Sequence, residues 1–114
     1  MKESIITISV SLDDKNVPEK INWEATDAGF DGKKNSQTLI LGLWDKNEAM
    51  TYSIDLWTKD LTVEDMNLHF HQLFLKMAET FERSTKNSEA ASMIKDFSSK
   101  FADKLKLKPD SNKS

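Results

Sequence analysis

The chain of 114 residues contains no cysteine, which excludes disulfide bridges, thiolate metal sites and cysteine nucleophiles. Its three glycines, Gly29, Gly32 and Gly42, do not form a phosphate-cradling loop. No apolar run approaches the ~18 residues of a membrane span, and no basic segment followed by a continuous apolar one marks a secretory signal. We therefore expect a cytoplasmic protein that does not insert into a membrane.

Residues suited to catalysis or metal binding are also sparse. His69 and His71 are two positions apart, whereas residues that share a helix face are three or four apart. We expect His69 in solvent and His71 at an interface or boundary, with no metal and no cofactor. No Gly-x-Ser-x-Gly elbow is present to position a serine nucleophile. The enzymatic alternative is a hydrolase or isomerase that uses Asp55 and His71.

The charge balance makes nucleic acid a poor partner. There are 19 acidic and 16 basic residues, which gives a net charge of −3. Lysines are locally in excess between Lys95 and Lys113, but no aromatic platform for bases lies among them. This segment therefore favours a solvated helix face, and we expect no nucleic-acid partner.

Apolar and polar residues alternate in the first half of the chain, as is typical of β-strands with two different faces. The predicted strands are residues 4–12, 19–25, 37–44 and 49–57. Short polar turns join the first strand to the second and the third to the fourth, which favours an antiparallel sheet. Residues 26–36 are expected to form a polar loop.

Two helices are predicted in the second half. The first runs from Thr62, an N-cap residue, to about Ser84. The second covers residues 89–105, where Ala90, Ile94, Phe97, Phe101 and Leu105 form one stripe. We expect residues 1–108 to form a single α+β domain and residues 109–114 to be a disordered tail, because the tail has nothing to bury.

The predicted fold is a four-stranded antiparallel sheet with both helices packed on one face. The other sheet face would then be open and would hold Ile40 and Trp44, with Trp57 nearby. Tryptophan is frequent among the anchors of protein interfaces. Two leucines on the first helix lie opposite its core face, beside a histidine. The predicted self- or partner interface is therefore Ile40, Trp44, Trp57, Leu68, His71 and Leu75. The alternative is that the tryptophans are core residues and the leucines are scattered surface residues.

Four blocks of sequence resemble the gliding motility protein GldC family of gliding Bacteroidota. They are Val17-Pro18-Glu19-Lys20-Ile21-Asn22-Trp23-Glu24-Ala25-Thr26-Asp27, Asp55-Leu56-Trp57-Thr58-Lys59-Asp60, Phe70-His71-Gln72, and Met77-Ala78-Glu79-Thr80-Phe81-Glu82-Arg83-Ser84-Thr85. Their order and spacing cover roughly residues 4–107, and the second and fourth blocks are fairly specific.

The resemblance implies a small accessory component of gliding motility, a process tied to the type IX secretion machinery. It implies no catalytic residues, and it implies protein partners from the gliding or secretion machinery. We also expect a homo-oligomer. A weaker, topological similarity to the export chaperone SecB suggests the alternative of a SecB-like holdase, which would hold unfolded exported proteins on apolar surface.

Overall fold

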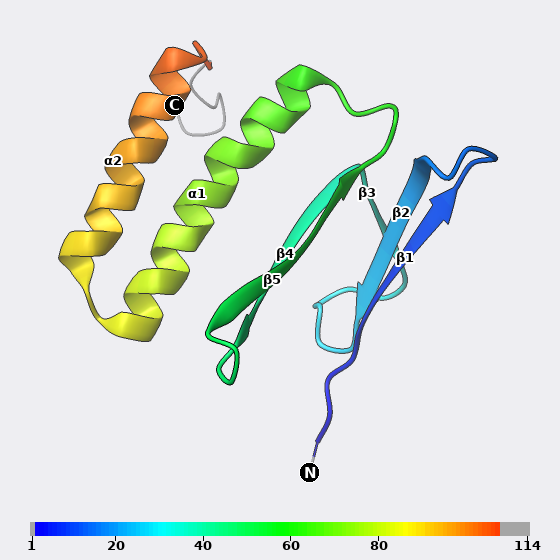
Figure 1. The fold of residues 1–114 in the computed structure, drawn as a ribbon, viewed down its shortest axis with the longest axis horizontal. Coiled ribbons are helices and arrows are strands. Elements are labelled where there is room, and N and C mark those ends of the chain that lie inside the picture. The colour runs from blue at the N-terminus through cyan, green and yellow to red at the C-terminus, as the bar shows by residue number, and fades with distance from the viewer. Residues whose placement is uncertain (1, 108–114) are drawn as a thin grey trace. The chain divides into compact units, whose positions relative to one another are not determined.

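The computed structural model describes residues 2–107, which divide between Leu61 and Thr62 into a β unit and a helical unit. The two units contain five strands and two helices (Figure 1), so the α+β class is confirmed. The elements are β1 (Ile6–Leu12), β2 (Pro18–Ala25), β3 (Lys34–Ser36), β4 (Thr38–Asp45), β5 (Met50–Trp57), α1 (Val63–Thr85) and α2 (Ser88–Lys104). The predicted tail at 109–114 lies outside the described residues, and a single domain over 1–108 stays a prediction.

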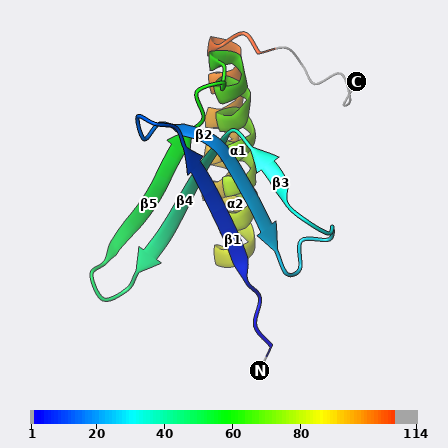
Figure 2. The ribbon, with the colours of Figure 1, turned by 90° about the vertical axis from the view of Figure 1, so that its right-hand side faces the viewer.

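The strands form two antiparallel sheets in place of the predicted single one. β1, β2 and β3 make a three-stranded sheet in that order (Figure 2), while β4 and β5 make a two-stranded hairpin. The predicted four-stranded sheet, and with it the SecB-like strand arrangement, is therefore wrong. The packing of both helices on one sheet face stays a prediction.

A bend at Gln37 is the reason for the division. Residues 34–45 are one extended stretch that is interrupted there, so that β2 pairs with the part before the bend and β5 with the part after it. The Ser36 hydroxyl donates to the Thr38 carbonyl at 2.7 Å, and the Thr58 N–H donates to the Gln37 carbonyl at 2.8 Å. These two bonds satisfy backbone groups at the bend and hold it in place.

The three-stranded sheet has one apolar and one polar face, as the alternation in its sequence predicts. Ile21 lies in its central strand, opposite Val10 on β1 and Ser36 on β3. With 1% of its surface exposed, Ile21 is the one large apolar side chain that is fully buried among the described residues. The core of the β unit is therefore small and centred on β2.

The helical unit is a hairpin of two helices that lie side by side (Figure 1). The Thr62 side chain accepts from the Asp65 N–H at 3.0 Å, which confirms Thr62 as the N-cap of α1. Ala78 on α1 and two residues of α2, Ala91 and Ser98, are fully buried. Small side chains at a helix contact allow the two backbones to approach closely. Within residues 2–107, no helix is both long enough and apolar enough to cross a bilayer.

The fully buried positions of α2 lie next to the predicted stripe, whose members are mostly half-buried. The stripe Ala90, Ile94, Phe97, Phe101 and Leu105 was expected to face the core, yet the fully buried positions are Ala91 and Ser98. Phe97 is more than half exposed, and its ring packs edge-to-face against Phe74 with the ring centroids 5.3 Å apart. Phe101 packs against the same Phe74 ring at 5.3 Å, so the bulky stripe takes part in the helix contact together with the fully buried small residues.

Candidate protein-binding surface

One face of the β4–β5 hairpin carries the two exposed tryptophans of the chain, and we call it the tryptophan face. Trp44 is opposite Thr51, and Trp57 is opposite Thr38. Trp44 is 66% exposed, Trp57 57% and Ile40 45%. The structure therefore places these three predicted interface residues on a single surface, and their role in binding stays a prediction.

The tryptophan face has polar groups between its apolar ones. Asp55 is the cross-strand partner of Ile40, and Ser53 is the partner of Gly42. Gly42 contributes no side chain between Ile40 and Trp44, so backbone is accessible at the centre of the face. Indole rings beside hydroxyl and carboxylate groups are the combination found where a protein interface has apolar anchors and polar contacts.

The opposite face of the same hairpin is also apolar and exposed. Its exposed members, which the sequence analysis did not select, are Leu43, Met50, Tyr52 and Ile54. The Tyr52 hydroxyl donates to the two carboxylate oxygens of Glu48 at 2.8 and 2.9 Å, which raises the pKa of Tyr52. Both faces of this two-stranded hairpin therefore carry exposed apolar side chains.

The three predicted interface residues of α1 have different surroundings. Leu68 is exposed, whereas Leu75 is half-buried. His71 lies at the helix contact, where its Nδ1 is 2.8 Å from the Ser98 hydroxyl and its carbonyl accepts from that hydroxyl at 3.1 Å. Both contacts are satisfied together when the Nδ1–H donates to the hydroxyl oxygen. The ring of His71 therefore links the two helices.

His69 does not lie in solvent as predicted. Its Nε2 atom is buried and has no hydrogen-bond partner among residues 2–107. The helical periodicity assigns His69 to the polar side of α1, so periodicity alone gave the wrong environment. In the part of the chain that the structure describes, no group of three or more carboxylates and imidazoles is placed to hold a metal ion.

Asp55 and His71 belong to different units. Asp55 is exposed on β5 opposite Ile40, while His71 is engaged by Ser98 inside the helical hairpin. An acid–base pair needs its two side chains within hydrogen-bond reach in one cleft. Neither unit by itself contains both side chains, so the alternative of a hydrolase or isomerase stays a prediction.

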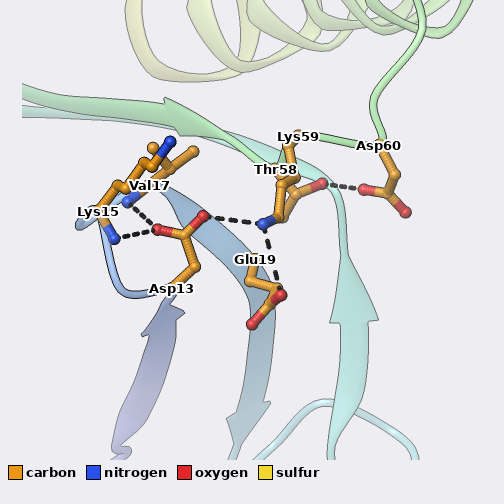
Figure 3. A network of polar contacts seen from close by, with 7 residues as sticks. All are labelled: Asp13, Lys15, Val17, Glu19, Thr58, Lys59 and Asp60. Atoms are coloured by element: carbon orange, nitrogen blue, oxygen red, sulfur yellow. Dashed lines mark hydrogen bonds and ion pairs between the residues drawn. The ribbon is translucent and has the colours of Figure 1, made fainter.

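A polar network lies where β5 ends (Figure 3). Thr58 is buried, and its hydroxyl contacts the Gln37 carbonyl and the Asp60 carboxylate. The Lys59 Nζ lies 2.8 Å from Asp13 Oδ2 and 3.5 Å from Glu19 Oε1. The network therefore connects the end of β5 to the turn between β1 and β2.

The Asp13 carboxylate is the centre of this network. It pairs with the Lys59 ammonium, and its Oδ1 accepts from the N–H groups of Val17 and Lys15. These contacts favour the ionised form and lower the pKa of Asp13 from 3.8 to about 2. The same ion pair raises the pKa of Lys59 above its usual value.

Asp13→Asn is expected to lower the free energy of unfolding at neutral pH. In acid the variant and the wild type are expected to be equally stable. The folded state lowers the pKa of Asp13, so its contribution is present above the unfolded value of 3.8 and disappears as the pH falls through about 2. Urea unfolding midpoints of the two proteins should therefore converge between about pH 5 and pH 2. Asp14→Asn is the control, because it removes the neighbouring carboxylate and leaves the Asp13–Lys59 pair intact. If the difference in urea midpoint between wild type and Asp13→Asn stays constant down to pH 2, the lowered pKa of Asp13 is contradicted.

Comparison with known proteins places most of the chain in one family. A family model described as gliding motility-associated protein GldC-like matches residues 18–107. The match covers β2 to β5 and both helices, and it begins after β1. No curated protein and no solved structure matches the chain, so the similarity to SecB finds no support.

Proposed function

The chain belongs to the GldC-like family of gliding motility-associated proteins, and from this we propose that it is an accessory component of gliding motility that acts by binding other proteins. Its partners are components of the gliding and type IX secretion machinery, and it acts in the cytoplasm without a catalytic step. The proposal includes self-association. The observation that carries it is the exposure of Trp44, Trp57 and Ile40 on one face of a two-stranded hairpin.

The tryptophan face has the composition of a binding surface. Truncation of a tryptophan at the centre of a protein interface commonly costs about 2 kcal/mol or more of binding free energy. The Trp44 and Trp57 rings can bury large apolar areas against a partner, while Asp55 and its neighbouring hydroxyls supply polar contacts that fix orientation. We infer that a folded protein partner covers this face.

The predicted residues of α1 make a smaller contribution in this proposal. Leu68 is exposed and available for contact, but Leu75 is half-buried and His71 is engaged by Ser98. We therefore expect Leu68 to bind a partner directly. His71 and Leu75 are expected to support that position through the helix contact.

A general holdase for unfolded exported proteins is the second candidate function. It is favoured by the exposure of Leu43, Tyr52 and Ile54 on the reverse face of the hairpin, because a surface that is apolar on both sides suits unfolded clients. A holdase would suppress the aggregation of unrelated unfolded proteins at equimolar ratio. A dedicated accessory protein would leave that aggregation unchanged and would retain one or two machinery components.

Trp44→Ala and Trp57→Ala test the proposed function. Tagged wild-type protein is used to isolate its partners from a gliding bacterium, and the affinity for the purified partner is then measured by calorimetry. Each substitution is expected to weaken binding by about 30-fold, which corresponds to the ~2 kcal/mol of an interface anchor. Val63→Ala is the matched control, since Val63 is also exposed and apolar but lies at the start of α1. Equal affinities for all four proteins would refute the tryptophan face as the binding surface.

A further inference from the structure

The outer edge of β1 has backbone groups that nothing in the described structure engages. The Thr26 N–H donates to the Ile5 carbonyl at 3.0 Å, so the alternation of the ladder directs the bonding groups of Thr7 and Ser9 toward β2. The N–H and carbonyl groups of Ile6, Ile8 and Val10 therefore point away from β2. β1 is an edge strand of its sheet (Figure 2), and among residues 2–107 no further strand pairs with it.

This edge lacks the features that proteins use to prevent strand pairing. Residues 4–12 contain no charged residue, no proline and no glycine, and Ile6 is 70% exposed. Charges, prolines and bulges are the usual protection of an exposed edge. Here a register shift occurs at the last step of β1, between Ser11 and Leu12. The remaining length of the strand is open to a second strand.

The edges of the β4–β5 hairpin are better protected. The Thr58 N–H bonds to Gln37, so the same alternation directs the backbone groups of Asp55 to the outer edge of β5, where its carboxylate is exposed. On β4 the Thr38 carbonyl already accepts from the Ser36 hydroxyl, and Gly42 interrupts the middle of the strand. β1 is therefore the edge most suited to pairing.

We propose that β1 pairs in antiparallel orientation with β1 of a second copy of this chain, around a two-fold axis at Ser9. This assignment rests on the self-association included in the proposed function and names its surface. β1 runs from Ile6 to Leu12, so Ser9 is its middle residue and a register centred there uses the whole strand. Ile8 then exchanges backbone hydrogen bonds with Val10 of the second copy, and the two three-stranded sheets become one six-stranded sheet.

The charges at the two ends of β1 favour a second copy in antiparallel orientation. Lys2 and Glu3 precede the strand, and Asp13, Asp14 and Lys15 follow it. In the register centred on Ser9, antiparallel pairing brings Glu3 of one copy toward Lys15 of the other and Lys2 toward the neighbouring acidic turn, whereas parallel pairing brings each charge beside its own copy. Within the strand only hydroxyl and aliphatic side chains meet, and Ser9 faces Ser9 without a charge. The strand is thus complementary to itself.

A single introduced cysteine tests the pairing directly, because the chain has no cysteine of its own. Ser9 would face its symmetry mate in a non-hydrogen-bonded pair, where the Cα atoms are about 4.5 Å apart, a separation that a disulfide can span. Ser9→Cys is expected to form a covalent dimer in oxidised glutathione, and wild-type protein to sediment as a dimer. Ser53→Cys, at an exposed position of β5, is the matched control and is expected to form little covalent dimer, although it should still sediment as a dimer like the wild type.

A charge exchange at the same position gives an independent readout. Ser9 is exposed on the polar face of the sheet opposite Asn22, so a charged side chain there leaves the fold intact, which circular dichroism verifies. Ser9→Glu and Ser9→Lys are each expected to weaken the dimer at least tenfold, since like charges then face each other across the axis. An equimolar mixture of the two variants is expected to form a heterodimer.

The outcomes separate this inference from the proposed function. Trp44→Ala should lose the partner and keep the dimer, whereas Ser9→Glu should lose the dimer and keep the partner. A monomeric wild-type protein, a dimer unaffected by Ser9→Glu, or cross-linking of Ser9→Cys no faster than that of Ser53→Cys would overturn the pairing at β1. Loss of partner capture by Ser9→Glu in a monomeric protein would mean that a strand of the partner occupies this edge, and would also overturn it.

Discussion

Ile21→Ala is expected to lower the free energy of unfolding of the β unit by about 2–5 kcal/mol. Ile21 is 1% exposed and lies in the central strand between Val10 and Ser36, so the substitution leaves a cavity that its neighbours fill only in part. Small domains have a total stability of about 5–15 kcal/mol. Loss of one side chain would therefore remove a large share of the stability of this unit.

The measurement is urea unfolding followed by tryptophan fluorescence in a Trp44→Phe, Trp57→Phe background, where the remaining indole, Trp23, lies two residues along β2 from Ile21. Ile54→Ala is the matched control, because it removes the same atoms from an exposed position on β5. The control is expected to change the unfolding free energy by less than about 1 kcal/mol. If both variants cost the same, the core of the β unit does not lie around Ile21.

Ser98→Leu is expected to destabilise the helical hairpin by about 3 kcal/mol or more. Ser98 is fully buried against α1, so the larger side chain forces the helices apart, which typically costs about 1–3 kcal/mol. The substitution also removes the hydroxyl that contacts both Nδ1 and the carbonyl of His71. A buried polar group left without a partner adds about 1–3 kcal/mol.

Two further variants separate the cost of the larger side chain from the cost of the lost hydrogen bond. Ser98→Ala removes the hydroxyl without adding volume and should show the hydrogen-bond term alone, while Ser99→Leu adds the same side chain at an exposed neighbouring position. Thermal unfolding followed by far-ultraviolet circular dichroism at 222 nm reports on the helices. The expected order of stability is Ser99→Leu, then Ser98→Ala, then Ser98→Leu. Equal stability of Ser98→Leu and Ser99→Leu would show that α2 does not pack through Ser98.

Alternating apolar residues were sufficient to locate most strands and helices. β1, β2, β4 and β5 lie within one or two residues of their predicted bounds, because each contains at least three alternating positions. The N-cap at Thr62 was also predictable, since a hydroxyl before an acidic first turn satisfies free backbone N–H groups. In these cases the interactions that determine the structure join residues only a few positions apart, so the sequence pattern is enough to predict the element.

The division into two sheets could not be predicted in this way. β3 consists of Lys34, Asn35 and Ser36, which have no apolar alternation, so the segment resembles a polar loop. The bend at Gln37 depends on the Thr58 N–H, which is 21 residues away in the sequence. Periodicity does not reveal such distant hydrogen bonds, and a continuous strand was the natural expectation.

The residues of the candidate surface could also be predicted only in part, because some of their contacts join residues far apart in the sequence. Trp44 and Trp57 could be selected because tryptophans on an open sheet face are informative by themselves. Leu43 and Ile54 were assigned to a face covered by the helices, and that packing stays a prediction; in the structure both side chains lie on the face of the hairpin opposite the tryptophans. The pair of Asp13 and Lys59 joins residues 46 positions apart, and no local pattern marks it.

The bend at Gln37 has a consequence for how the β unit opens. Because residues 34–45 belong to both sheets, fraying of the three-stranded sheet at β3 releases the first residues of β4, and loss of β5 frees the carbonyl that fixes the bend. The two sheets are therefore coupled into one cooperative foldon, whose amides should exchange with solvent together.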